Sequence, residues 1–366
     1  MNGALAHTGH EKAMDWKLKK TYTCVLEHET GYIKRIWGEY NTVCLAYPHH
    51  YRTGMANLGF HTIYKIINAQ PSFLCERVFL TVPGSEARFA SGTAGIFSLE
   101  NQKPVAEFDI LAFSVSFEND YPHILKMMEL AGIPLLARDR SEKHPLVIGG
   151  GIALTLNPEP LADFFDLFIL GEAEEVLPKF CGAFENARRL GQPRREFLKE
   201  TQKKINNVYV PGLYEIQYST ESKIQSVKPL EAELPEKIKI QRVRDLDAFS
   251  TEEVVSAPQT EMGDMFLVEV NRGCARACRF CAASFVYHPV RFRSGSEILK
   301  SVDRGLQRKK KVGLIGTAVS DHPALIDICG YITAQKAQAG LGSLRVDQIQ
   351  ESIVDLMKEG GIDTVA

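Results

Sequence analysis

The sequence lacks long hydrophobic runs, has almost no net charge and contains few cysteines. No apolar stretch approaches the roughly 20 residues that a membrane-spanning helix needs, and the first residues lack the apolar segment of a secretory signal. The net charge of −2 gives no bulk electrostatic reason to expect nucleic-acid binding. Eight cysteines among 366 residues are too sparse for a disulfide framework. These absences predict a reduced, cytoplasmic globular protein whose cysteines have another role.

The first half of the chain alternates buried strand patterns with helical patterns. Apolar runs at 41–47, 75–82, 108–117, 146–148 and 167–170 indicate strands, and apolar spacing at 55–68 and 121–131 indicates helices. Strands that alternate with helices favour a parallel sheet covered by helices. We therefore predict an α/β fold, with a Rossmann-like domain over residues 38–185 preceded by a lead-in over 1–37.

A connecting region is predicted over residues 186–262. Its runs at 208–216 and 237–243 indicate short strands of a small β insertion. A basic stretch at 188–204 has helical spacing, and such a stretch is more often a solvated helix face than a nucleic-acid site.

A third pattern of strands and helices begins at residue 263. Strands are predicted at 266–270, 312–315, 343–346 and 362–366, with helices at 296–310, 324–337 and 348–359. Ser294 is expected to cap the first of these helices. The pattern is that of a (β/α) barrel that stops within its fourth strand, which suggests the amino-terminal part of a longer protein or a truncated product. An open sheet edge would favour association, so we expect poor solubility or reduced activity of the isolated chain.

The most informative stretch is FLVEVNRGCARACRFC, residues 266–281. A buried strand pattern runs into a turn signal, and Cys274, Cys278 and Cys281 follow with C-x3-C-x2-C spacing. Thiolates are the ligands of iron–sulfur clusters, and three of them would leave one metal position open, as in catalytic metal sites. Arg272, Arg276 and Arg279 are expected to surround the loop with positive charge, which favours thiolate over thiol.

Two other interpretations of these cysteines stay open. Positions i, i+4 and i+7 fall on one face of a helix, where free cysteines are ordinary core residues. Alternatively, His288 could complete a Cys3His zinc site in a non-enzymatic adaptor, although its distance in sequence from Cys281 is unusually long for such a site.

The cysteine loop resembles that of the radical SAM enzymes, whose signature C-x3-C-x-aromatic-C has its aromatic residue here in Phe280. The resemblance implies that Cys274, Cys278 and Cys281 bind a [4Fe-4S] cluster and that S-adenosylmethionine chelates the open iron. It also implies a reductant such as flavodoxin or ferredoxin. By the same resemblance the S-adenosylmethionine contacts are expected among Phe280, Gly316, Thr317, Ser343 and Arg345. Residues 263–366 would then form a partial radical SAM barrel.

The Rossmann-like half resembles the cobalamin-binding domain that precedes one branch of radical SAM enzymes. The segments that carry this resemblance are Ser114-Val115-Ser116-Phe117, Gly149-Gly150-Gly151 and Gly171-Glu172. It implies cobalamin contacts at Ser114, Ser116, Gly149, Gly150, Gly151 and Glu172. The family's D-x-H-x-x-G motif stands here as His49-His50-Tyr51-Arg52-Thr53-Gly54, with tyrosine at the place of the cobalt-binding histidine. Either cobalamin binds without a protein histidine, or the domain has kept the fold and lost the cofactor.

The expected activity is thus that of a radical SAM enzyme, with radical methyl transfer if cobalamin binds and hydrogen abstraction or sulfur insertion if it does not. The substrate, small or macromolecular, and the catalytic residues beyond the cluster are not indicated. A rival enzyme interpretation is a radical modifier of tRNA or a ribosomal protein, similar to methylthiotransferases. Against it, Cys24, Cys44 and Cys75 are spread over separate predicted elements and do not form a second cysteine cluster.

Overall fold

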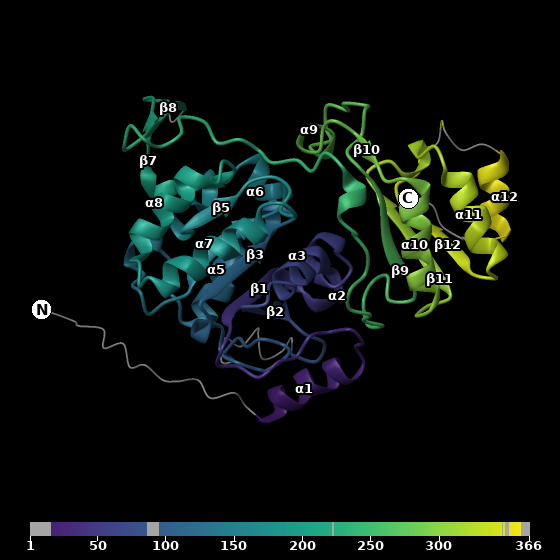
Figure 1. Cartoon of the computed structure of the whole chain (residues 1–366), viewed down its shortest axis with the longest axis horizontal. Coiled ribbons are helices and arrows are strands. Elements are labelled where there is room, and N and C mark those ends of the chain that lie inside the picture. Colours follow the sequence, from purple (N-terminus) through teal and green to yellow (C-terminus); the bar gives the residue numbers. More distant parts are fainter. Residues whose placement is uncertain (1–15, 86–94, 222, 346, 348–350, 360–366) are drawn as a thin grey trace, which may run out of the picture.

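The computed structural model describes residues 16–85, 95–221, 223–345, 347 and 351–359. Within them the chain is a mixed α/β protein with two sheets that are mostly parallel and one short hairpin. Figure 1 shows the two larger sheets in separate lobes, side by side, with a long segment running between them. The predicted α/β class is confirmed at this level.

The first sheet has the strand order β2-β1-β3-β4-β5-β6. Its first five strands in chain order pair in parallel, and β6 pairs antiparallel to β5. The strands are β1 (Asn41–His50), β2 (Phe73–Thr81), β3 (Ile110–Ser114), β4 (Leu146–Gly150), β5 (Leu167–Ile169) and β6 (Val208–Tyr209). Every residue of β2 is buried, including Glu76 and Arg77 in its middle, so its sequence does not alternate between apolar and polar residues.

Helices connect and cover these strands. They are α1 (Trp16–Glu27), α2 (Tyr51–Gly54), α3 (Leu58–Asn68), α5 (Tyr121–Ala131), α6 (Ile152–Leu156), α7 (Leu177–Arg189) and α8 (Arg194–Lys204). The sequence supplies local stop and start signals: Asn57 caps α3 by accepting from the Phe60 amide, and α5 ends at Gly132 with a φ of 70°. One continuous core joins α1, this sheet and parts of the connecting region.

The second sheet has the order β10-β9-β11-β12 and its own core. Its elements are β9 (Phe266–Arg272), α9 (Ala283–Val286), β10 (Arg291–Phe292), α10 (Gly295–Leu306), β11 (Lys311–Gly316), α11 (Leu325–Ala334), β12 (Gln338–Leu341) and α12 (Glu351–Glu359). Strands β9, β11 and β12 are parallel, whereas β10 runs antiparallel to β9. Ser294 caps α10 as predicted, because its side chain accepts from the Glu297 amide.

The connecting region differs from the prediction. The run 208–216 divides at Pro211, which cannot donate a ladder hydrogen bond: β6 joins the large sheet, and β7 (Tyr214–Tyr218) forms a hairpin with β8 (Ile224–Pro229). Residues 237–243 are not a strand and touch the first sheet through one bridge between Gly171 and Gln241. The basic stretch 188–204 is helical over most of its length, and its cations form ion pairs such as Arg194–Asp166 and Lys203–Glu233.

The third strand of the second sheet was predicted in the wrong place. It is β12, which pairs with β11 from Lys311 opposite Gln338 to Leu314 opposite Leu341. Residues 343–345 of the predicted strand are not in a strand, and residue 346 lies outside the described residues. Ser343 has a φ of 47° and lies in the turn after this strand. Residues 338–341 carry a weak strand signal, so their pairing is imposed by β11. The start of the predicted helix at 348–350 and the strand at 362–366 lie outside the described residues.

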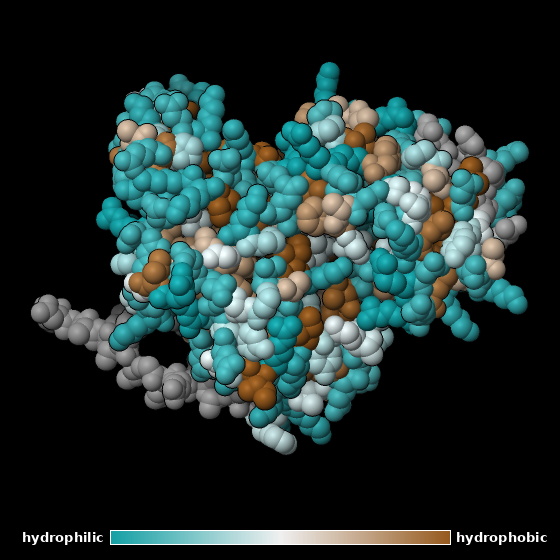
Figure 2. Space-filling view, in the orientation of Figure 1, coloured by the Kyte–Doolittle hydropathy of each residue, from teal (hydrophilic) through white to brown (hydrophobic). Residues whose placement is uncertain are grey.

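None of the described helices has the length and apolar character that crossing a membrane would require. The face drawn in Figure 2 is mainly hydrophilic, with hydrophobic residues gathered toward the middle, where the two lobes meet.

Candidate functional site

The cysteine loop occupies residues 273–290, between β9 and β10. Gly273 opens it with a φ of 84°, and a Cβ there would lie 2.3 Å from the Tyr287 carbonyl oxygen, so that only glycine fits. The Gly273 amide donates to the Thr317 hydroxyl at 3.2 Å, which ties the start of the loop to the end of β11. This turn sends the chain away from the sheet directly before the first cysteine.

The three cysteines of the motif are free and lie on this loop. Cys278 is exposed and Cys274 and Cys281 are partly exposed. The nearby Ser284 backbone amide lowers the pKa of the Cys281 thiol. The helix-face interpretation is therefore wrong, because the loop is not one helix and these cysteines do not belong to a core.

The donor set fits an iron–sulfur cluster by chemistry, since it offers soft sulfur ligands with lowered proton affinity at Cys281. Across the described residues, no group of three or more His, Cys, Asp or Glu side chains is gathered closely enough to hold a metal ion. Residues 275–280 are all exposed, so bringing the sulfur atoms together would change the loop and leave the core of β9 intact. His288, the fourth ligand of the zinc alternative, is exposed as well.

The arginines of the loop have unequal surroundings. Arg276 is half exposed, 3.9 Å from Asp321, and Arg279 is exposed. Arg272 is buried and does not surround the cysteines as expected. Its guanidinium points into the space between the two sheets, where it meets Glu172, Glu174 and Glu269. Three carboxylates hold it, and their charges raise its pKa.

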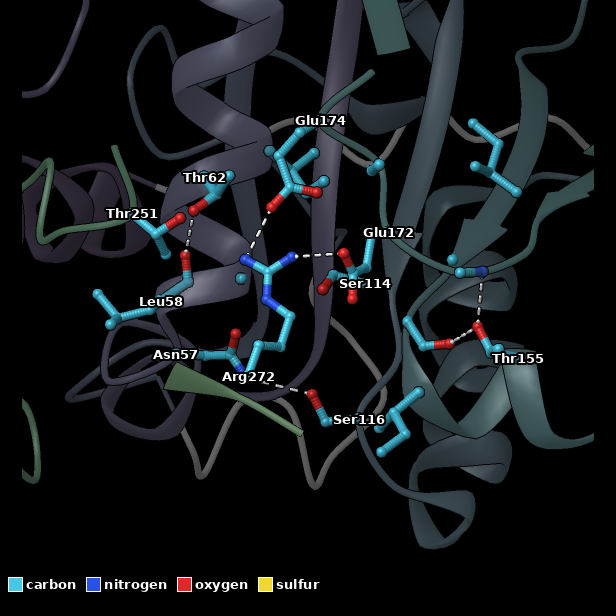
Figure 3. Close-up of a pocket in the computed structure, with 18 of the residues that line it drawn as sticks. Asn57, Leu58, Thr62, Ser114, Ser116, Thr155, Glu172, Glu174, Thr251 and Arg272 are labelled. Carbon is cyan, nitrogen blue, oxygen red and sulfur yellow. Dashed lines mark hydrogen bonds and ion pairs between the residues drawn. The ribbon is translucent and has the colours of Figure 1, made fainter. Parts of the chain in front are cut away.

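A cavity of about 420 Å³ lies between the two sheets, beside this arginine. Figure 3 shows Arg272 between Glu172 and Glu174, with Ser114, Ser116 and Asn57 close by. The first sheet contributes the carboxyl ends of β3, β4 and β5, and the second sheet contributes the ends of β9 and β11. Carboxyl ends of parallel strands are the usual ligand-binding edge of such sheets.

Many of the predicted site residues meet at this cavity. Those that line it are Ser114, Ser116, Gly149, Gly150, Gly151, Glu172, Gly316 and Thr317. The three cysteines, Phe280, Ser343 and Arg345 do not line it. Phe280 is 92% exposed on the loop. Arg345 pairs with Asp321 and Asp347, and its expected position on a strand is wrong.

The glycines of the first edge serve contacts within the chain. Gly151 has a φ of 115°, and a Cβ on it would lie 2.2 Å from the Val115 carbonyl oxygen. A Cβ on Gly149 would lie 2.7 Å from the Leu154 side chain and 2.8 Å from the Phe165 ring. At Gly171, with a φ of 96°, it would lie 2.2 Å from the Gln241 carbonyl oxygen. These close approaches explain the glycines without a ligand.

The side chains of the segment that replaces the cobalt-binding motif also make contacts within the chain. Tyr51 is buried, and its hydroxyl donates to Glu29 at 2.6 Å. A Cβ at Gly54 would lie 2.6 Å from the Phe79 ring. His50 bonds to the Thr81 hydroxyl, and His49 faces the ring of His123 at 5.9 Å.

Several cavity residues were not singled out from the sequence. They are Asn57, Thr155, Glu174, Glu269, Asn271 and Tyr287. Glu269 had a usable signal, because a carboxylate inside the apolar run FLVEV must be paired if the strand is buried. In the structure Arg272 and Arg293 pair with it and lower its pKa against the effect of burial. Asn271 had no such signal; its Oδ1 is buried without a hydrogen-bond partner at the cavity wall.

Residues 59–211 match the model of a family described as radical SAM proteins, N-terminal. The matched residues lie wholly before the cysteine loop, so the match is independent of the C-x3-C-x2-C motif. It supports placing the chain in the radical SAM superfamily.

An uncharacterised protein of Methanocaldococcus jannaschii is 24% identical to this chain over 322 residues, which are 86% of this chain and 58% of that protein. The chain thus spans somewhat more than half the length of this curated relative. A structure of D-alanyl-alanine synthetase A from Vibrio cholerae is 19% identical, with 27% of this chain and 31% of that chain covered. Its TM-score of 0.18 is too low to carry an argument about the fold.

Proposed function

We propose that this chain carries the cluster loop of a radical SAM iron–sulfur enzyme that acts on a substrate held between the two sheets. One observation carries the proposal. Three free cysteines with C-x3-C-x2-C spacing lie on one exposed loop directly after β9, and the base of that loop forms a wall of the cavity. The family match to residues 59–211 supports it from another part of the chain.

Cys274, Cys278 and Cys281 would hold a [4Fe-4S] cluster. Such a group, when bound and reduced, supplies one electron to the sulfonium of S-adenosylmethionine, whose carbon–sulfur bond breaks into methionine and a 5′-deoxyadenosyl radical. The Ser284 backbone amide favours the thiolate form of Cys281 by lowering its pKa. Arg276 and Arg279 place positive charge beside the sulfur ligands. A flavodoxin or ferredoxin would deliver the electron at this exposed loop.

The strand orders support the architecture expected for such an enzyme. The order β2-β1-β3-β4-β5 in the first sheet is one of the two common orders of doubly wound α/β sheets. In the second sheet, β9, β11 and β12 lie side by side and are parallel, as the strands of a (β/α) barrel are, with the short antiparallel β10 on the outer edge of β9. We infer a Rossmann-like domain followed by part of a barrel.

The cavity favours a small substrate without negative charge. Its volume of about 420 Å³ lies within the range of about 300–1,000 Å³ typical of small-molecule sites. Hydroxyls of Ser114 and Ser116 offer hydrogen bonds at its wall. The Arg272 guanidinium is already shared among carboxylates, so that it offers little to an anionic ligand.

The residues do not fit cobalamin. A corrinoid is larger than the ligands for which a cavity of about 420 Å³ is suited. Tyr51, at the place of the cobalt-binding histidine, is buried against Glu29. Gly149 and Gly151 are needed for the chain's own packing. Of the two interpretations of this domain, we favour a kept fold without the cofactor, and we derive no methyl transfer through a corrinoid.

A second cysteine cluster, which a methylthiotransferase-like enzyme would need, has little support. Cys44 and Cys75 are buried in neighbouring strands, and burial raises the pKa of both thiols. Cys24 is exposed on α1. Buried thiols of raised pKa are inert structural groups.

The test is anaerobic purification followed by reconstitution with iron and sulfide. The proposal expects about four irons per chain, as a [4Fe-4S] cluster requires, broad visible absorption, and dithionite-dependent release of 5′-deoxyadenosine from S-adenosylmethionine. One zinc per chain without cleavage would overturn it in favour of the adaptor with Cys274, Cys278, Cys281 and His288. A bound corrinoid would overturn the inference that the cofactor has been lost.

A further inference from the structure

Both ends of the cysteine loop meet one carboxylate of the first sheet region. The loop leaves β9 after Arg272 and enters β10 at Arg291, and these two residues are opposite each other in the antiparallel pair. Their guanidinium groups both bind Glu172, which follows β5. A residue 100 positions from Arg272 and 119 positions from Arg291 in the chain therefore fixes the base of the loop.

The contacts of Glu172 use both of its oxygens. Arg291 binds it in a bidentate manner, with distances of 2.6 Å to Oε1 and 2.8 Å to Oε2. Arg272 lies 3.1 Å from Oε2, and the Val243 amide donates to the same oxygen at 2.7 Å. The side chain is 4% exposed. Paired guanidinium–carboxylate contacts shielded from water are strong and fix geometry as well as charge.

The position of Glu172 is set by its own backbone. Gly171 approaches Gln241 so closely that no side chain fits, and the Glu172 amide donates to the Gln241 carbonyl oxygen at 2.9 Å. The carboxylate is thus held before it meets the arginines. A corrinoid contact, which the family resemblance assigned to this residue, would have to displace two ion pairs.

Two further contacts from the first sheet and the segment after it each reach only one part of the loop base. Glu174 binds Arg272 at 2.8 Å and so reaches one end of the loop. Arg242 donates to the Val286 carbonyl oxygen at 3.1 Å, within α9. Glu172 contacts both ends, with hydrogen bonds from Arg291 and an ion pair to Arg272, and it also lines the cavity.

We propose that Glu172 is a positioning residue for the cysteine loop, which it holds at the cavity wall through Arg272 and Arg291. Its effect on a cluster rests on the function proposed above, whereas its effect on the loop itself does not. Removal of the charge leaves the Arg291 guanidinium without a carboxylate partner and takes one of three carboxylates from Arg272, so that only the short β9–β10 pairing and the remaining partners of Arg272 hold the ends of the loop.

The first test needs no cluster. Arg276 and Arg279 are exposed trypsin sites within the loop. Trypsin cuts an extended segment, so limited digestion of the apo-protein reports how often the loop unfolds locally from its base. We expect Glu172→Gln to speed cleavage at these two sites about tenfold, which corresponds to about 1.4 kcal/mol, because the amide removes the charge that pairs with Arg272 and Arg291. Glu172→Asp keeps the charge and should restore part of the protection.

Glu253→Gln is the matched control. Glu253 is 5% exposed and pairs at 2.7 Å with Lys309, which lies between α10 and β11 and does not belong to the cysteine loop. Glu253→Gln should lower the melting temperature, because a buried ion pair is lost, and should leave cleavage at Arg276 and Arg279 unchanged. Equal acceleration by Glu253→Gln, or unchanged loop cleavage in Glu172→Gln, overturns the proposal.

The second test uses the reconstituted protein. Glu172→Gln should still bind iron through its cysteines, but the electron paramagnetic resonance signal of the reduced cluster with S-adenosylmethionine should broaden or shift, and KM for S-adenosylmethionine should rise more than kcat falls. A signal identical to wild type overturns the effect on the cluster. If the wild type takes up no iron, the proposed function fails, and the trypsin result decides the loop contact separately.

Discussion

Two edges of this molecule face the same cavity and have opposite characters. The glycine-rich edge of the first sheet is closed on itself, since Gly149, Gly151 and Gly171 each make an approach that a Cβ would forbid. The cysteine loop is open: Cys278 is exposed and Phe280 is 92% exposed. The glycines are explained by the packing of the fold. The exposed cysteines and Phe280 contribute nothing to that packing, so their explanation must be a chemical function.

The same comparison applies to charge. Arg272 and Glu172 are buried, Glu269 is 14% exposed, and all of them are paired between the sheets. Arg276 and Arg279 on the open loop are exposed. Substitutions at the closed edge should therefore change stability, and those on the loop should change metal binding while the fold persists.

The largest expected effect is that of Cys281→Ala on iron binding. Loss of one of the three sulfur ligands should remove most of the iron after reconstitution and abolish cleavage of S-adenosylmethionine, while circular dichroism stays unchanged. Cys24→Ala, an exposed cysteine on α1, is the control and should bind iron like wild type. Retention of full iron by Cys281→Ala would contradict the proposed role of the loop.

Gly151→Ala should be the most harmful of these changes to stability. The methyl group would meet the Val115 carbonyl oxygen at 2.2 Å in a left-handed backbone, and strain together with overpacking should cost about 3 kcal/mol or more. Urea unfolding measures it. Gly132→Ala has a φ of 70° with open space around it, and should cost only about 1 kcal/mol. Equal costs would show that the closed edge is not closely packed.

His61 should make stability depend on pH. It is buried where the linker crosses α3; its Nε2 lies 2.9 Å from the Met55 carbonyl oxygen, and its Nδ1 accepts from the Val255 amide at 3.3 Å. Burial lowers the pKa of His61 to about 4 from its usual 6.5. Between these values the unfolded chain binds more protons, so the contribution is complete above pH 6.5 and is lost as pH falls toward 4.

From pH 7 to pH 5 this loss should amount to about 2 kcal/mol. The variant His61→Gln cannot titrate, so the wild type minus variant difference in unfolding free energy isolates the histidine from the other groups. A difference that does not change over this pH range would mean that His61 is not buried in solution.

Ala277→Gly should have the smallest effect. Ala277 has a φ of 49° on the open loop, so glycine relieves a left-handed backbone but loosens the unfolded chain, and the two terms nearly cancel to within about 0.5 kcal/mol. Urea unfolding should not distinguish it from wild type. A large loss of stability would show that the loop is part of the packed structure.

The sequence was informative wherever a signal is local. Runs made mostly of apolar residues located β1, β2 and β9, because a strand buried on both faces consists mainly of apolar residues. Ser294 was recognised as a helix cap by its type and position. The sequence pattern predicted the next strand in the wrong place. That strand is Gln338–Leu341, whose residues pair only because β11 lies beside them.

By itself the sequence determined the mixed α/β class and put Cys274, Cys278 and Cys281 on one loop, because periodicity and spacing are properties of neighbouring residues. Only the tertiary structure decided which residues meet across the chain. It joined Glu172 to Arg272 and Arg291, enclosed the cavity between the sheets, and turned Gly149 and Gly151 toward the chain's own packing. Pairing of charges and close backbone approach depend on positions in space, and a linear pattern carries no measure of those distances.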